Sequence, residues 1–462
     1  MTTELGTLTL VGMGTLAAGS WLAVLWRKTG LYGLTLLTVV TSICLGYFFW
    51  HVEKPFPLSL DRVLWGLLVI ALGADFLRRR PDLSCLVRAD FFAGLLLIYL
   101  FVSATGGFLL TGVTSGFSRW LFFYAFPATL YVAARRFGDN PSGQRATLVV
   151  FSALAVYLSL TGLAEVLGWN ALVFPRYIAD TSITDEFFGR ARGPLLNPVG
   201  NGFLILIGWA AWTVFTVQAP PPRRAIFLLG HGLFAVAVAC TLTRSVWLSA
   251  AACAMVVGAW VTPSRFRAAW VTTALLMLLG AGLVAGVYFR EMKRDRHLSA
   301  DEAARSVQLR PLLAAAAWRM FQERPMFGFG LAQYDRTKLA YLEDPTAPLP
   351  LRQAKPYTQH NVFLSLLVET GVIGLGLFGC FLAASVGVFR RNWGNPARPM
   401  SLLALVAVVA YVVNGLFHDV SIILDMNAVL FLMVGLAVRE SSHDVAEIPQ
   451  NARLGLPVAF TE

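Results

Sequence analysis

Apolar residues occur along the chain in long blocks that short polar segments separate. A helix of about 20 residues crosses a hydrocarbon core of about 30 Å, and in lipid a helix satisfies all its own backbone polar groups. The blocks therefore predict an all-α polytopic membrane protein with 12 or 13 transmembrane helices. The number depends on the last two, which only residues 418–420 separate. The expected spans are 6–26, 31–50, 63–77, 91–110, 120–134, 146–168, 200–218, 225–243, 246–262, 268–289, 361–389, 401–417 and 421–438.

Basic residues gather in alternate loops between these spans, which is typical of cytoplasmic loops. They are Arg27 with Lys28, Arg78 to Arg80, Arg135 with Arg136, Arg223 with Arg224, Arg265 with Arg267, and Arg390 with Arg391. The alternation places the tail 439–462 in the cytoplasm and the connections 169–199 and 290–360 outside. The spans then form three groups, within 1–168, 200–289 and 361–438.

Composition excludes a soluble domain. The chain is 57% hydrophobic and 14% charged, with a mean hydropathy of +0.65, whereas about a quarter of the residues of a soluble protein are charged. Basic cytoplasmic loops account for much of the net charge of +11, so we expect no nucleic-acid partner. The five cysteines are scattered and predict neither a disulfide framework nor a metal cluster. We expect the first apolar block to be a retained helix and not a cleaved signal peptide.

The connection 290–360 is long enough to form a small helical subdomain outside the membrane. Ser299 and Glu302 form a capping-box pattern that predicts the start of one helix. Proline suits the first turn of a helix, so Pro311 is expected to open a second helix that runs to about Glu323. The segment 312–321 is apolar enough to lie on the membrane surface.

Four polar features interrupt the segments expected outside, and each has a structural alternative. They are Arg190 and Arg192 before the Asn197-Pro198 turn, Arg244, Arg310 with Arg319, and His360-Asn361 followed by Glu369. Interfacial arginines often extend to lipid headgroups, and arginines on a surface helix are usually solvated. Arg244 has Glu165 and Glu369 as alternative partners. A lone interfacial histidine is often only a polar anchor.

Taken together, the four features indicate anion chemistry on one side of the membrane. The chain has no Asp-x-Asp pattern, through which a divalent metal would hold a diphosphate. Guanidinium groups bind phosphate directly, so the arginines predict a metal-independent diphosphate site with no cofactor. Imidazole suits proton transfer near neutral pH. Glu369 lies nine residues after His360, half a helical turn out of phase, so we expect Glu369 to hold another helix and not to touch His360.

These residues occur in an order that resembles the O-antigen ligase/polymerase superfamily of bacterial membrane glycosyltransferases. The resemblance covers about 185–375. It rests on Arg190-x-x-Gly193-x-x-x-Asn197-Pro198, Thr-x-Thr-Arg244, Arg310 before Pro325-Met326-Phe327-Gly328-Phe329-Gly330, and His360-Asn361 before Glu369-Thr370-Gly371. Three positions depart from the family pattern. Val199 replaces a second asparagine, Thr243 replaces a serine, and Ala314 stands where a tryptophan is frequent.

The resemblance implies that a glycan moves from undecaprenyl diphosphate to an acceptor hydroxyl, with inversion, at the periplasmic face of the bacterial inner membrane. The acceptor is lipid A-core in the ligases and another lipid-linked glycan in the polymerases, and both remain open. His360 is implied as general base, and Arg190, Arg244 and Arg310 as the diphosphate-binding arginines. The spacing to Pro325 favours Arg310 over Arg319. Expected supporting residues are Asn197, Asn361, Glu369, Arg192 and Arg319.

Two other functions compete with this interpretation. A lipid-linked glycan flippase would also be polytopic and basic, but its arginines should line a cavity within the membrane. A metal-dependent transferase would need an acidic motif in the first outer loop. Glu53 and Asp61 lie there, but they are eight residues apart and have no partner pattern.

Overall fold

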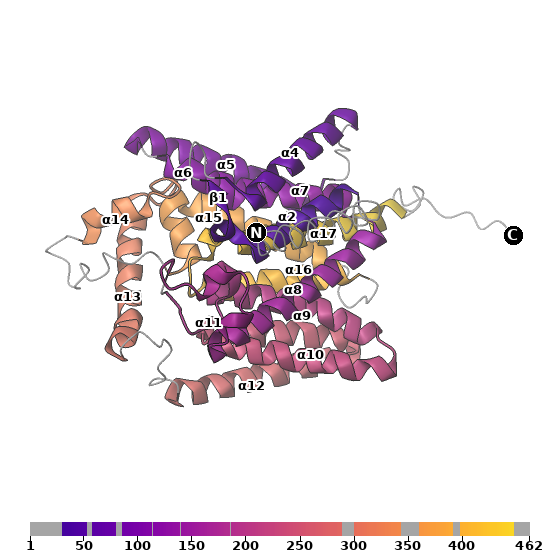
Figure 1. Ribbon diagram of the computed structural model, residues 1–462. Helices are drawn as coiled ribbons and strands as arrows, with labels where there is room; N and C mark the ends of the chain where they lie inside the picture. The colour runs from indigo at the N-terminus through magenta and orange to yellow at the C-terminus, as the bar shows by residue number, and fades with distance from the viewer. Residues whose placement is uncertain are drawn as a thin grey trace, which may run out of the picture.

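The computed structural model describes residues 30–52, 58–79, 86–112, 114–138, 140–184, 186–288, 300–342, 360–390 and 398–447. These residues are predominantly helical (Figure 1). One two-stranded antiparallel sheet pairs β1 (His51–Val52) with β2 (Leu58–Ser59). The predicted span 6–26 and the capping serine Ser299 lie outside the described residues.

Each predicted span from 31–50 onward coincides with helical structure. The helices are α2 (Leu31–Cys44) with α3 (Gly46–Phe49), α4 (Leu60–Arg78), α5 (Arg88–Thr111), α6 (Ser115–Trp120) continuing through the π-helical turn Leu121–Ala125 into α7 (Phe126–Phe137), α8 (Pro141–Leu167), α9 (Pro198–Gln218), α10 (Pro221–Cys240), α11 (Arg244–Val261), α12 (Arg267–Tyr288), α15 (Val362–Phe389), α16 (Pro399–Gly415) and α17 (Leu424–Glu447). Within the described ranges, six helices are long and apolar enough to cross a membrane: α5, α8, α9, α10, α11 and α15. The chain is therefore an all-α polytopic membrane protein.

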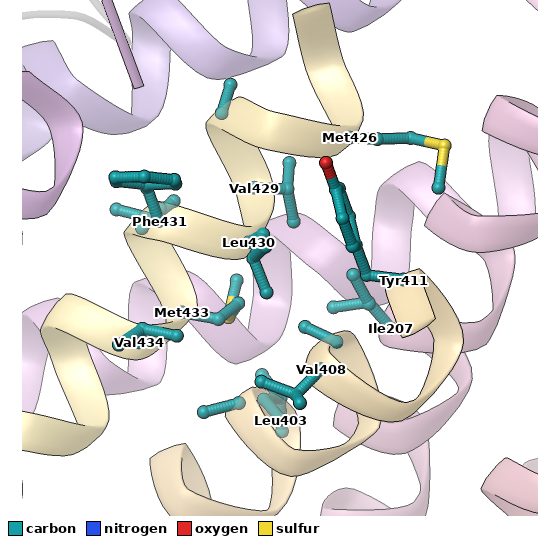
Figure 2. Packing of buried hydrophobic residues seen from close by; sticks show 14 of the residues in the cluster. Ile207, Leu403, Val408, Tyr411, Met426, Val429, Leu430, Phe431, Met433 and Val434 are labelled. Carbon is teal, nitrogen blue, oxygen red and sulfur yellow. The ribbon is translucent and has the colours of Figure 1, made fainter. Parts of the chain in front are cut away.

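The centre of the bundle lies where α17 packs against α7 and α16, and α9 packs against α8 and α16. Figure 2 shows Ile207 of α9, Leu403 and Val408 of α16, and Leu430 of α17 in one apolar cluster. Residues 426–438 of α17 are buried without interruption. A helix that is apolar on all sides is stable when other helices cover it on all sides, and α17 meets this condition.

Two further helices pack against α15. In Figure 1, α13 (Ala300–Glu323) crosses one end of the bundle, and α14 (Tyr334–Leu342) lies beside it. The second helix expected to open at Pro311 is wrong, because α13 continues through this proline. A proline removes one helical hydrogen bond. Here Leu309 and Leu313, on either side of it, are both buried in a cluster with Leu342 of α14, and this packing holds the helix together.

Helix α15 is broken at Gly371, where the backbone has φ 67° and ψ −171°. The loop Pro325–Gly330, which follows α13, fills the break. The amides of Phe329 and Gly330 donate to the carbonyls of Val368 and Glu369, at 3.0 and 2.9 Å. In the other direction, the Val372 amide donates to the Pro325 carbonyl at 2.9 Å. Backbone groups that the break would leave unpaired in lipid are therefore satisfied by this loop.

The glycines of the two motifs are required by this close approach. A Cβ on Gly371 would overlap the Met326 carbonyl oxygen, and one on Gly328 would overlap the Glu369 backbone. Both residues also have positive φ, at +67° and +68°, which side chains strongly disfavour. The sequences Pro325–Gly330 and Glu369-Thr370-Gly371 thus form one joint, which fixes α13 relative to α15.

Gly371→Ala is expected to lower the melting temperature of the purified protein strongly. The backbone at φ 67° and ψ −171° is adopted almost only by glycine and costs about 1–3 kcal/mol for a residue with a side chain, and the overlap with Met326 adds to it. Gly376→Ala is the matched control, because a Cβ at Gly376 meets nothing within 4 Å and alanine favours the helix. Thermal unfolding followed by tryptophan fluorescence compares the two. Equal stability of both variants would contradict the joint.

Candidate functional site

Several connections meet at one end of the bundle, and they carry most of the predicted site residues. The loop before α9 is joined to the end of α10, because the Ala191 amide donates to the Cys240 carbonyl at 2.9 Å. The start of α15 is joined to the end of α16, because the Asn361 side-chain amide donates to the Leu416 carbonyl at 3.0 Å. The structure thus brings together segments that are far apart in sequence.

Arg192 holds the loop 176–196 together. Its side chain is fully buried, and its guanidinium donates to the carbonyls of Thr184, Glu186 and Ile178 at 3.0, 2.9 and 2.8 Å. It also lies 3.5 Å from the Glu165 carboxylate, at the end of α8. This residue was predicted to support the site. In the structure it lies under the loop and fixes the loop's conformation through these hydrogen bonds.

Arg190 and Asn197 occupy the two edges of the same loop. The Arg190 guanidinium lies 5.2 Å from the centre of the Phe187 ring, and the side chain is partly exposed. Asn197 caps α9, because its side-chain oxygen accepts from the amides of Val199 and Gly200 at 2.9 and 3.2 Å. Pro198 occupies the first turn of the helix, where proline fits. The Asn-Pro motif is therefore a helix start, and Val199 contributes its backbone amide to it.

Arg244 and Arg310 come from different helices and lie within electrostatic reach of each other. Arg244 is the first residue of α11, and Arg310 lies on α13. Burial and the positive charge of Arg244 lower the pKa of the Arg310 guanidinium from its ordinary value. Two like charges held together are unfavourable unless an anion binds between them, so this pair can form an anion site.

His360 lies beside this pair, at the start of α15. Burial and the charge of Arg310 lower the pKa of its imidazole, while Asp419 opposes the shift. His360 is therefore neutral at pH 7 and able to accept a proton. Asn361 caps α15, its side-chain oxygen accepting from the amides of Phe363 and Leu364 at 2.9 and 3.0 Å. The cap and the Leu416 bond orient this segment.

His418 is a second histidine at the same place, and the sequence analysis did not assign it to the site. It lies in the short connection between α16 and α17. Burial lowers its pKa to about 3, and the charges of Arg310, His360 and Arg190 act in the same direction. The group therefore comprises three arginines and two neutral histidines, each from a separate one of five segments. The sequence signal was the pair His418-Asp419, which is polar between two apolar blocks.

Arg119 of α6 connects this group to the interior of the bundle. Its guanidinium lies 3.0 Å from Glu369 and 3.4 Å from Asp419, and it donates to the Ser421 hydroxyl at 3.0 Å. Glu369 is buried and faces this arginine, which confirms that it holds another helix. Sequence reasoning missed Arg119, although it is the only charged residue between Asp90 and Arg135.

Arg319 lies apart from the group by helical geometry. It follows Arg310 by nine residues on the same helix, which places it on the opposite side of α13. In the parts of the chain that the structure describes, no three His, Cys, Asp or Glu side chains are grouped so that they could hold a metal ion. Among the described residues, Arg190, Arg244 and Arg310 are the arginines that gather with the two histidines at this end.

Residues 229–379 match the family model described as O-antigen ligase. The matched segment contains Arg244, Arg310, His360 and the joint between α13 and α15, whereas Arg190 and Asn197 precede it. Among curated proteins, none matches the chain. The match confirms the resemblance to the O-antigen ligase/polymerase superfamily and supports a glycosyltransferase-type function.

Glu369→Gln is expected to destabilise the protein more than Asp75→Asn. The Glu369 and Arg119 side chains are 1% and 14% exposed, and breaking a buried pair leaves an uncompensated charge, at a cost of about 3 kcal/mol. Asp75 pairs with Arg136 at 2.7 Å, in a more exposed place where the cost is about 1 kcal/mol or less. Thermal unfolding of both variants measures the difference. A larger loss for Asp75→Asn would contradict the role assigned to Glu369.

Proposed function

We propose, on the premise that residues 229–379 belong to the O-antigen ligase family, that this protein transfers a glycan from undecaprenyl diphosphate to an acceptor hydroxyl. The observation that carries the proposal is the convergence of Arg190, Arg244 and Arg310 with His360 and His418 at one end of the bundle. Arginines in the middle of the bundle would have favoured a flippase. A group at the end of the bundle favours an enzyme.

The three arginines bind the diphosphate of the donor in this proposal. When the bond between the anomeric carbon and the diphosphate oxygen breaks, negative charge grows on that oxygen, and fixed guanidinium groups stabilise it. Guanidinium groups can do this without a divalent metal ion, because they donate paired hydrogen bonds to phosphate. The undecaprenyl diphosphate then leaves, and its apolar tail lies between membrane helices.

His360 accepts the proton of the acceptor hydroxyl as that oxygen attacks the anomeric carbon. A lowered pKa keeps this imidazole neutral, which a general base requires. One displacement from the face opposite the diphosphate inverts the anomeric centre. His418 lies beside His360, and we assign it the positioning of the acceptor hydroxyl. The acceptor is lipid A-core or a second lipid-linked glycan.

Replacing Arg244 or Arg310 by alanine is expected to weaken donor binding and to slow transfer by about 10²–10³, as loss of one transition-state donor does elsewhere. Replacement by lysine should retain only part of the donor affinity and of the transfer rate, because an ammonium group lacks the paired hydrogen-bond donors of a guanidinium. Arg319→Ala is the matched control on α13 and should remain near normal. Donor affinity and turnover are measured separately on purified, folded variants, with and without excess EDTA. Loss of transfer in EDTA that a divalent ion restores would contradict metal independence.

His360→Gln should leave donor affinity nearly intact and lower turnover by about 10²–10⁴. The pH profile gives a second readout. Because the pKa of His360 is below its ordinary value, the base stays unprotonated to a more acidic pH, and the wild-type rate should fall only below about pH 6.5. This acidic limb should be absent from the residual rate of His360→Gln. Near-normal turnover of this variant would show that His360 is only a polar anchor.

The site is proposed to face the periplasm of a bacterial inner membrane, because the basic loops lie at the other end of the bundle. Ser182 lies in the loop before α9 at the site end, and Ser142 lies at the start of α8 at the other end; both are exposed. In a cysteine-free background, Ser182→Cys should react with an impermeant thiol reagent in cells with a permeabilised outer membrane. Ser142→Cys should react only after the inner membrane is opened. Labelling from one side would contradict the orientation.

A further inference from the structure

A cavity of about 540 Å³ lies at the end of the bundle opposite the candidate site. The starts of α8, α10 and α16 and the end of α9 line it, and it is open to solvent. The far ends of these helices reach the site: the end of α8 contacts Arg192, the end of α10 binds the Ala191 amide, and the end of α16 binds Asn361. The cavity is therefore separate from the site by the length of the bundle.

Two charged side chains line this cavity, and both are arginines. Arg145 comes from α8 and Arg223 from α10, and both are exposed to solvent. None of the residues that line the cavity is acidic. The cavity thus has a positive charge that the residues lining it leave uncompensated.

The rest of the lining is mainly apolar, with Leu148, Phe215 and Phe227 as its larger side chains. Beyond the cavity, α10 continues with an apolar outer face, where Ile226 is 65% exposed and Leu229 is 76% exposed. In a protein that spans a membrane, such a face contacts acyl chains. The cavity therefore joins a cationic mouth to a lipid-facing apolar surface.

We propose that this cavity binds the phosphate headgroup of an anionic phospholipid in the leaflet opposite the candidate site. Arg145 and Arg223 bind the phosphodiester from two helices, and the glycerol and first acyl carbons lie on Leu148 and Phe227. Basic pockets between membrane helices bind anionic lipids in this way. Free phosphate would use the two arginines but not the apolar walls. The bound lipid links α8 to α10, so it should stabilise the folded bundle by mass action.

The test uses the full-length protein in detergent and follows its melting temperature by tryptophan fluorescence. The probes are phosphatidylglycerol, phosphatidylcholine with the same acyl chains, and inorganic phosphate. The double variant Arg145→Gln/Arg223→Gln removes both charges from the cavity. The double variant Arg88→Gln/Arg265→Gln is the matched control, because it removes two exposed arginines that do not line the cavity.

Phosphatidylglycerol should raise the melting temperature of the wild type and of the control with the same saturating midpoint. In the cavity variant, the midpoint should rise on the order of tenfold or more. If the double variant does not fold, the two single variants provide the same test. The phosphatidylglycerol midpoint of each is expected to lie between those of the wild type and the double variant. An equal response of the cavity variant, an equal effect of phosphatidylcholine, or the full shift with inorganic phosphate would each overturn the proposal.

Discussion

The geometry of the candidate site depends on the backbone joint between the loop Pro325–Gly330 and the break of α15 at Gly371. A helix broken inside a membrane has unpaired amides and carbonyls, and each costs several kcal/mol in lipid. The loop satisfies them and, in doing so, is fixed in place itself. Because α13 leads directly into this loop, the joint determines where Arg310 lies relative to His360, which starts the same broken helix.

Ion pairs inside the bundle stabilise the same arrangement. Arg119 links Glu369, two residues before the break, to Asp419 in the connection between α16 and α17. His418 adjoins Asp419, so a single guanidinium positions both the part of α15 next to its break and the second histidine. Buried ion pairs contribute little net stability but are costly to break, which makes them suited to fixing a geometry. The joint and the ion network together hold four segments at one end of the bundle.

Most of the fold could be predicted from the sequence, because blocks of apolar residues have one stable form in lipid. Local patterns failed where packing decided the outcome. Pro311 predicted the start of a new helix, but α13 continues past this proline because Leu309 and Leu313 pack against α14. Arg190 and Arg192 both suit an anion site by residue type, and only the family resemblance distinguished them; the structure buries Arg192 under the loop and leaves Arg190 partly exposed.

The site was predictable only in part, for a related reason. Arg244, Arg310 and His360 were found through an ordered set of motifs, and the structure brings them together. Arg119 and His418 belong to no sequence motif. The partners of Arg119 are 250 or more residues away in the sequence, and the charged groups near His418 come from three distant segments. Sequence separation of this kind gives no local signal. What remained visible was a charged or polar residue in an apolar context, and such residues merit attention in any membrane protein.

The most direct test of the account is an experimental structure of the protein with a non-transferable analogue of a polyprenyl-diphosphate-linked sugar. The diphosphate should lie among the guanidinium groups of Arg190, Arg244 and Arg310. The anomeric carbon of the sugar should be on the side of His360. A diphosphate bound elsewhere, such as beside Arg145 and Arg223 at the opposite end of the bundle, would contradict it.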